Sequence, residues 1–139
     1  MAHEDLDALL DDLLGFAQAQ LAKCGEFFPF GGKVDAAGGI SHVQGWTEDE
    51  RPPSQQLIDL LVIGLRMQAQ RREIRASGIC SDIRFAAAGD GSESDAISVR
   101  LEHANGEVSH VFLPYQRGRD GNLAYGDLFA TGGQPDIFK

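Results

Sequence analysis

The sequence predicts an α+β protein in which a single antiparallel sheet is accompanied by an N-terminal helix and a long second helix. Two segments have the apolar periodicity of amphipathic helices, the segments after each of them are short and strand-like, and Asn105-Gly106 joins two of these strands as a hairpin would. The expected order is helix, two strands, helix, three strands and a packed tail. We expect residues 1–139 to form a single domain.

Composition and charge narrow the possible partners. The chain has 139 residues, 42% of them hydrophobic, and a formal net charge of −9. A chain of this length can bury a core without disulfides or a metal. The negative charge would repel phosphate backbones and anionic membrane surfaces. We therefore expect neither a nucleic-acid partner nor a membrane partner.

The compartment is expected to be the cytoplasm. No apolar run reaches the roughly 18 residues of a membrane span, and the acidic N-terminus is unlike a signal peptide. Cys24 and Cys80 are too few for a disulfide framework, so we expect both to be free, small buried residues. Cys80 begins a strand, where no helix dipole lowers a thiol pKa, and is interpreted as structural rather than nucleophilic.

The first expected helix is N-terminal. Its apolar face consists of residues three or four positions apart, namely Leu6, Leu10, Leu13, Ala17, Leu21 and Cys24. Its first turns carry five acidic residues: Glu4, Asp5, Asp7, Asp11 and Asp12. The helix dipole favours negative charge there, so we interpret the acidic run as a solvated helix start, with a docking surface for a basic partner as the alternative. Gly25 is the expected C-cap.

The stretch FFPFGGKVDAAGGISHV predicts a hairpin. Phe27–Val34 and Gly39–Gln44 are the expected strands, and Asp35-Ala36-Ala37-Gly38 suits a type I turn. Pro29 cannot donate a ladder hydrogen bond, so the first strand is expected to be at an edge or irregular there.

The second helix is expected from Ser54 to Ala76, after Pro52-Pro53. Its apolar face comprises Leu57, Ile58, Leu61, Val62, Leu65 and Ala69. Four arginines collect toward its end: Arg66, Arg71, Arg72 and Arg75. We interpret them as complementing the helix dipole or pairing with the protein's own acids, with a site for an anion or an acidic partner as the alternative.

Three more strands are expected, over Ile79–Ala87, Ala96–His103 and Glu107–Tyr115. The remaining segment, Gly118–Lys139, is glycine-rich but too apolar for a disordered tail. We expect it to lie on the body of the protein, partly as a short strand.

The Asn105-Gly106 turn decides how the last two strands pair. A two-residue loop, which this dipeptide favours, pairs Val99 with Phe112 and turns His110 toward the core. A three-residue loop with a glycine bulge pairs Val99 with Val111 and turns His110 to the opposite face. We predict the two-residue loop and a His110 that is at least half buried.

The order of elements resembles the profilin-like class of folds, which includes roadblock and longin domains. In that class a hairpin and a three-stranded meander form one antiparallel sheet and are joined through a long helix. The segments FFPFGGKVDAAGGI, AISVRLEHANGEVSHVFLPY and YGDLFATGGQPDIF also look like parts of an uncharacterised bacterial family of small proteins. That resemblance implies no activity and assigns no functional residue.

Catalytic and cofactor motifs are absent from the sequence. The chain contains neither Gly-x-Ser-x-Gly nor a phosphate-binding loop, and Gly89-Asp90-Gly91 lacks the third glycine of a dinucleotide fingerprint. The loop that holds Asp90, Glu93 and Asp95 lacks the glycine and distal glutamate of a calcium loop and is interpreted as a solvated turn. We expect no enzymatic activity and no cofactor.

Three histidines are the best candidates for a metal site. His42, His103 and His110 lie on strands of one expected sheet and would be joined by Glu102 or Asp35. None of them has the close spacing of a zinc motif such as H-x-x-x-H. We interpret them as structural and expect no metal.

Two classes of function remain. The first is a protein-interaction module that binds another protein or a second copy of itself as a homodimer, because sheet edges can pair with a partner. The alternative is a small-molecule binding or sensing domain with a pocket walled by Phe28, Phe30, Trp46 and Tyr115. Burial discriminates between them, since fully packed phenylalanines would leave no cavity, whereas a concave pocket with convergent polar groups would favour sensing.

Overall fold

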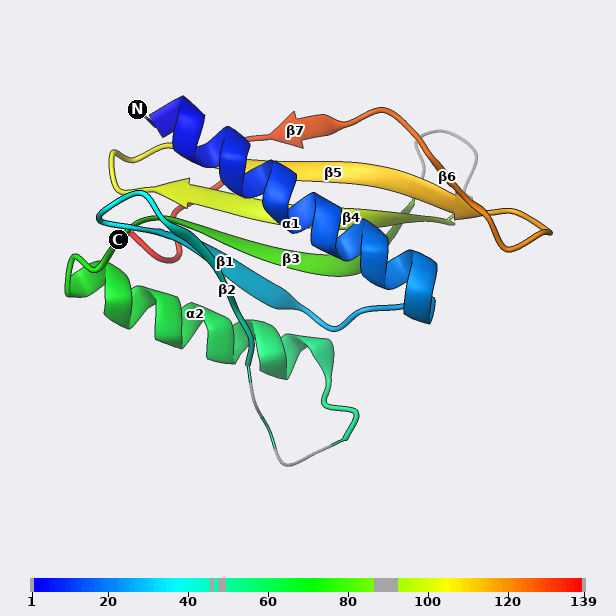
Figure 1. Cartoon of the computed structure of the whole chain (residues 1–139), viewed down its shortest axis with the longest axis horizontal. Coiled ribbons are helices and arrows are strands. Elements are labelled where there is room, and N and C mark those ends of the chain that lie inside the picture. Colours follow the sequence, from blue (N-terminus) through cyan, green and yellow to red (C-terminus); the bar gives the residue numbers. More distant parts are fainter. Residues whose placement is uncertain (1, 46, 48–49, 87–92, 139) are drawn as a thin grey trace.

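The computed structural model describes residues 2–45, 47, 50–86 and 93–138, and confirms the α+β class (Figure 1). Within this part of the chain, one open antiparallel sheet contains seven strands. Helix α1 spans Ala2–Cys24 and helix α2 spans Ser54–Gln70. Neither described helix has the length and apolarity that crossing a membrane requires.

The strands follow the order β2-β1-β3-β4-β5-β6, and β7 also pairs with β5. Their bounds are Phe30–Asp35 for β1, Ile40–Val43 for β2, Ile74–Ala86 for β3, Glu93–His103 for β4, Val108–Arg117 for β5, Leu123–Tyr125 for β6 and Phe129–Thr131 for β7. The hairpin therefore joins the meander through β1 and β3. Strand β1 starts directly after Pro29 and is flanked on both sides, so it is not an edge strand.

The two helices cover opposite faces of the sheet. A Cβ atom at Gly32 would lie 2.7 Å from Leu13 Cδ2 of α1, whereas one at Gly31 would lie 3.4 Å from Leu61 Cδ2 of α2. Successive residues of a strand face opposite sides, so these neighbouring glycines mark the two faces. Gly32 is paired with Gly78 of β3, and the missing side chains of this pair allow α1 to approach the sheet closely.

The core beneath α1 largely follows the predicted apolar face. Leu6, Leu13, Ala17 and Leu21 are buried against the sheet. The prediction omitted Leu9, which is fully buried. Gly25 ends the helix with φ of 80°, as expected of a C-cap, and its N–H donates to Leu21 O over 3.0 Å.

The acidic helix start is solvated except at Asp5. The Asp5 side chain is buried, and its Oδ1 accepts a 2.8 Å hydrogen bond from Arg75 Nη2. Its Oδ2 lies 3.0 Å from His103 Nε2. The hydrogen bond from Arg75 is the main reason that the pKa of Asp5 is lowered. Interpreting all five acids as a solvated start was therefore wrong for Asp5, because its cationic partner lies 70 residues away.

Replacing Asp5 with Asn is expected to lower the free energy of unfolding at pH 7 by about 1.5–3 kcal/mol, the range for a hydrogen bond to a charged group. The folded pKa is below the unfolded value, so the carboxylate stabilises the fold above about pH 4, and this contribution is lost as pH falls. Urea denaturation at pH 7 and pH 3 should show the gap between wild type and Asp5→Asn closing at the lower pH. The exposed Asp11→Asn is the control; an equal effect of both variants at pH 7 would contradict this account.

Helix α2 ends at Gln70, six residues before the predicted end at Ala76. Its predicted apolar face is confirmed, with Leu57, Leu61 and Leu65 buried. The helix stops because Arg72 adopts φ of 59°, and the N–H groups of Arg72 and Glu73 donate to Ala69 O and Gln68 O. This is the hydrogen-bond pattern of a Schellman cap, in which glycine usually occupies the left-handed position.

Replacing Arg72 with Gly is expected to raise the free energy of unfolding by about 1 kcal/mol, because an L-residue is strained at positive φ and glycine is not. The gain should appear as an increase of several degrees in Tm. Thermal melts of Arg72→Gly and of the neighbouring Arg71→Gly provide the comparison. Arg71 has φ of −83°, so its variant should gain nothing, and equal gains would contradict the assignment of strain to Arg72.

The predicted two-residue loop between β4 and β5 is wrong. Val99 pairs with Val111, and His103 N donates to Glu107 O over 2.9 Å, which leaves three loop residues. Gly106 has φ of 102°, as the bulge of a three-residue loop requires. His110 consequently lies on the face opposite the α1 core, so its predicted place in that core was wrong, although its side chain is more than half buried, as predicted.

Candidate functional site

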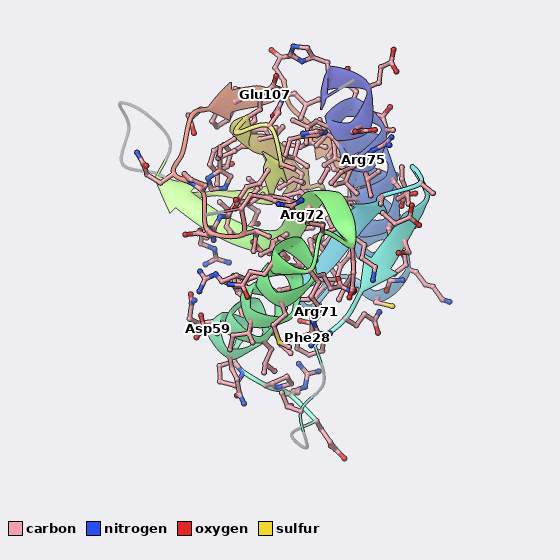
Figure 2. The ribbon with its side chains drawn as sticks, turned by 90° about the vertical axis from the view of Figure 1, so that its left-hand side faces the viewer. Phe28, Asp59, Arg71, Arg72, Arg75 and Glu107 are labelled. Atoms are coloured by element: carbon pink, nitrogen blue, oxygen red, sulfur yellow. The ribbon has the colours of Figure 1, made fainter. Side chains whose placement is uncertain are left out.

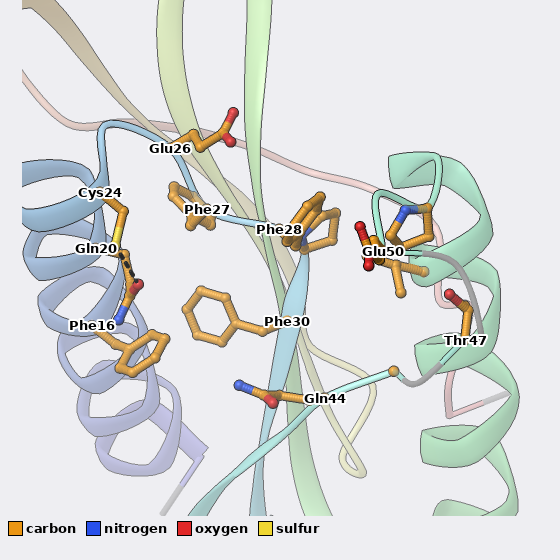
Figure 3. Close-up of a pocket in the computed structure, with 14 residues that line it drawn as sticks. Phe16, Gln20, Cys24, Glu26, Phe27, Phe28, Phe30, Gln44, Thr47 and Glu50 are labelled. Carbon is orange, nitrogen blue, oxygen red and sulfur yellow. Dashed lines mark hydrogen bonds between the residues drawn. The ribbon is translucent and has the colours of Figure 1, made fainter.

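A pocket of about 590 Å³ lies where the end of α1, the segment before β1 and the beginning of α2 meet (Figure 3). Its walls include Phe16, Phe27, Phe28, Phe30, Pro52 and Leu57. The volume is within the range of ligand pockets, roughly 300–1,000 Å³. The aromatic stretch singled out in the sequence thus borders a cavity as well as the core.

The phenylalanines divide into an anchored cluster and an exposed one. Phe30 is buried, and its ring centroid lies 4.9 Å from that of Phe16 and 5.8 Å from that of Phe27, both in edge-to-face geometry. Phe28 is 45% exposed. Figure 3 shows Phe16, Phe27 and Phe30 gathered on the α1 side, and Phe28 between this cluster and Glu50. Three rings therefore form a fixed wall, while Phe28 presents apolar surface at the mouth.

The polar groups of the pocket are acidic or neutral. Glu26 and Glu50 contribute carboxylates, and Gln20 and Gln44 contribute amides, while the described lining residues include no lysine or arginine. Arg51 lies on the exposed rim, where its Nη1 is 3.2 Å from Glu26 Oε1. With Glu26 paired to Arg51, Glu50 leaves the described lining and Arg51 with a net charge of −1, which suits an apolar group that is accompanied by positive charge.

An apolar surface continues from the pocket along α2. We call it the α2 stripe and define it as Leu60, Ile63 and Met67, which are 39%, 57% and 47% exposed. It begins at the pocket rim, because a Cβ atom at the lining residue Gly45 would lie 3.6 Å from Leu60 Cβ. Seven residues of helix extend the surface by about 10 Å. Contiguous exposed apolar surface of this kind marks interaction sites.

Of the other two predicted pocket residues, Tyr115 is not part of this site. Tyr115 is buried on the α1 side of the sheet, where its hydroxyl donates a 2.7 Å hydrogen bond to Asp82 Oδ1. Burial raises the pKa of Asp82, and burial together with that hydrogen bond raises the pKa of Tyr115. Trp46 and the acidic loop residue Asp90 lie outside the described residues.

The three histidines do not converge on a metal site. His42 pairs with Asp12, His103 with Asp5, and His110 Nε2 lies 2.6 Å from Ser98 Oγ. The other two candidate ligands also have structural roles, since Asp35 accepts N–H groups within its turn and Glu102 holds the C-terminal segment. In the described part of the chain, no three His, Cys, Asp or Glu side chains are grouped to hold a metal ion.

The sequence reasoning missed the contribution of α1 to the pocket. Phe16, Gln20 and Cys24 all line it and are spaced four residues apart, so they share one stripe of the helix. That spacing was available in the sequence. The pattern was not recognised because Cys24 was assigned to the core face of the helix. The structure instead places Cys24 in an exposed position at the end of α1.

Both cysteines are free, as predicted, but only Cys80 is buried. Burial raises the pKa of the Cys80 thiol and shields it, whereas Cys24 is exposed at the pocket. A thiol reagent such as DTNB is expected to label one cysteine per native chain rapidly and two after denaturation, because attack needs an accessible thiolate. Cys24→Ser should abolish the rapid phase, and rapid labelling of that variant would show that Cys80 is accessible.

Comparison with known proteins assigns no role to any residue of this site. No family model, curated protein or solved structure matches the chain.

Proposed function

We propose that the protein is a non-catalytic interaction module whose pocket and α2 stripe together receive a segment of a partner protein. The continuity of the pocket with the exposed Leu60, Ile63 and Met67 is the observation that carries this proposal. A small ligand needs only the pocket, whereas a peptide with several apolar anchors uses the stripe as well. Two free cysteines support a reducing compartment, and we propose the cytoplasm.

The chemistry of the surface defines the partner segment. The chain has a net charge of −9, and Glu26 and Glu50 lie at the pocket. A segment with an aromatic or aliphatic anchor and flanking lysines or arginines complements both the apolar walls and this charge.

The surroundings of three possible nucleophiles, Ser98, Cys80 and Cys24, support a non-catalytic role. Ser98 lies beside His110 as in a nucleophilic pair, but Ser98 is only 3% exposed and cannot reach a substrate in this fold. Cys80 is fully buried. Cys24 is accessible, but its Sγ contacts the amide oxygen of Gln20 rather than a base.

Selection of random peptides displayed on phage tests this function. Immobilised wild-type protein is expected to enrich peptides with an apolar anchor and basic flanks. Phe28→Ser should lose them, whereas Leu128→Ser should retain them, because Leu128 is 51% exposed but outside the pocket lining. The proposal fails if no sequence is enriched, or if the enriched peptides bind the Phe28→Ser variant equally well.

A small-molecule sensor is the second candidate, favoured by the pocket volume and by the glutamine and glutamate side chains in its lining. Ile63→Ser distinguishes the two functions, because Ile63 belongs to the stripe and not to the pocket lining. A peptide that spans both surfaces should bind at least tenfold more weakly to Ile63→Ser. A metabolite found by ligand-observed NMR should be lost in Phe28→Ser and unaffected in Ile63→Ser.

A second copy of the chain is one partner that the α2 stripe can accept, and we propose a homodimer on this surface. The stripe is apolar, and β2 is an edge strand of the sheet, able to pair with another strand. Light scattering at tens of micromolar should give a dimer for wild type and a monomer for Ile63→Asp. A monomeric wild type would leave the stripe to a different protein.

A further inference from the structure

A second cavity lies at the end of the molecule where three turns meet. It has a volume of about 640 Å³ and is lined by residues from the β1–β2 turn, the α2–β3 turn, the β4–β5 turn and the C-terminal segment. Two backbone hydrogen bonds tie the turns together, from Ala36 N to Glu73 O over 3.1 Å and from Ala104 N to Arg75 O over 2.9 Å. The walls are therefore already held in place.

The charge of this cavity is opposite to that of the protein. Its described lining includes Arg72 and Arg75 and no acidic side chain, in a chain with 21 acidic and 12 basic residues. Figure 2 shows both arginines, with Arg71, on the side of the molecule that faces the viewer. The lining of the aromatic pocket has the opposite charge, since its described residues include two glutamates and no lysine or arginine.

Only one of the two arginines has its charge available. Arg75 Nη2 lies 2.8 Å from Asp5 Oδ1, so the charge of Arg75 is neutralised by a buried carboxylate. Arg72 is exposed, so its guanidinium is open to an anion that enters the cavity. One guanidinium matches a singly charged carboxylate and can bind it with two hydrogen bonds.

Arg72 also occupies a backbone position that disfavours it. Its φ of 59° is at the left-handed position of a helix cap, where glycine would fit without strain. Strained residues of this kind gather at functional sites. The last-turn carbonyl oxygens of Met67, Gln68 and Ala69 already accept backbone N–H groups, so they do not need the guanidinium of Arg72.

Apart from the two arginines and the amide of Gln70, the lining of the cavity is apolar. Ile74, Ile137 and Phe138 contribute large side chains, and three alanines contribute small ones. We propose that this cavity binds a small carboxylate with a hydrophobic body, with Arg72 holding the carboxylate and the wall of Ile74, Ile137 and Phe138 holding the body. This site is separate from the aromatic pocket and independent of the function proposed for it.

Titration with octanoate, octylammonium and inorganic phosphate, followed by amide chemical shifts of the full chain, tests the proposal. Octanoate is expected to shift amides at the three turns. Octylammonium, which has the same body and the opposite charge, should not shift them. Phosphate, which has charge without an apolar body, should bind at least tenfold more weakly than octanoate.

Arg72→Asn is the informative variant, because asparagine tolerates the left-handed conformation and removes the charge. It should weaken octanoate binding at least tenfold. Arg71→Asn, which removes a neighbouring arginine that is not part of the lining, should leave binding unchanged. The proposal is overturned if octanoate shifts no amides at the turns, if octylammonium shifts them equally, or if the two variants bind octanoate alike.

Discussion

Replacing Glu102 with Ala is expected to lower the free energy of unfolding by about 3 kcal/mol or more, because each buried N–H group left without an acceptor costs about 1–3 kcal/mol. Glu102 is buried on β4, and its carboxylate accepts the backbone N–H groups of Asp136, Ile137 and Phe138 over 2.9–3.2 Å. Alanine would leave these three N–H groups without their acceptor, and Ile137 would lose the contacts that bury it.

Chemical denaturation measures the loss, and amide hydrogen exchange of residues 136–138 locates it. Glu73→Ala is the control, because Glu73 is exposed and its nearest cation, Arg71 Nη1, is 3.9 Å away. That variant should change stability by less than about 0.5 kcal/mol. If Glu102→Ala retained full stability and full amide protection at the C-terminal segment, the carboxylate would not be what holds this segment.

Replacing Gly78 with Val is expected to lower the free energy of unfolding by about 3 kcal/mol, at the upper end for an overpacked core. A Cβ atom at Gly78 would lie 2.6 Å from Leu13 Cδ1 and 3.2 Å from Leu101 Cδ2. Leu13 is fully buried, so it has little room to move away, and α1 would be displaced from the sheet.

Gly15→Ala provides a control of opposite sign. A Cβ atom there would have no neighbour within 4 Å, and alanine in a helix interior is more favourable than glycine by about 0.5–1 kcal/mol. Urea denaturation should therefore show Gly78→Val destabilised and Gly15→Ala stabilised. A Gly78→Val variant as stable as wild type would contradict the close approach of α1.

Local patterns predicted the elements of this fold well, and long-range packing explains where they failed. Leu57, Leu61 and Leu65 defined the apolar face of α2 because helical periodicity is a local property. The end of α2 was predicted at Ala76, but the left-handed Arg72 ends the helix at Gln70 and β3 already begins at Ile74. Gly78 lies inside β3, where the absence of a side chain leaves room for Leu13 of α1 to pack against the strand.

The register of the β4–β5 hairpin shows a conflict between a local preference and the core. Asn-Gly favours a two-residue loop, but the three-residue loop pairs Val99 with Val111 beneath α1. The burial of these branched side chains determined the register, and the turn preference of Asn-Gly contains no information about that burial.

The candidate site was only partly predictable. Phe28 and Phe30 were identified because aromatic residues beside glycine are conspicuous in a sequence. Tyr115 was assigned to the pocket, although its strand places it in the core beside Asp82. Glu50 and Leu57 join the pocket through the approach of α2 to β1, which depends on Gly31 and is not encoded in any short motif.

Mapping of the binding surface by NMR tests the interaction proposal most directly. Protein labelled with ¹⁵N is titrated with a peptide enriched on the wild type, and amide shifts are followed. We predict the largest shifts in the segment between Gln20 and Phe30 and along α2 from Leu57 to Met67, with none in Phe28→Ser. Shifts confined to β6, β7 or the turns around Arg72 would contradict the proposal that the aromatic pocket and α2 stripe form the binding surface.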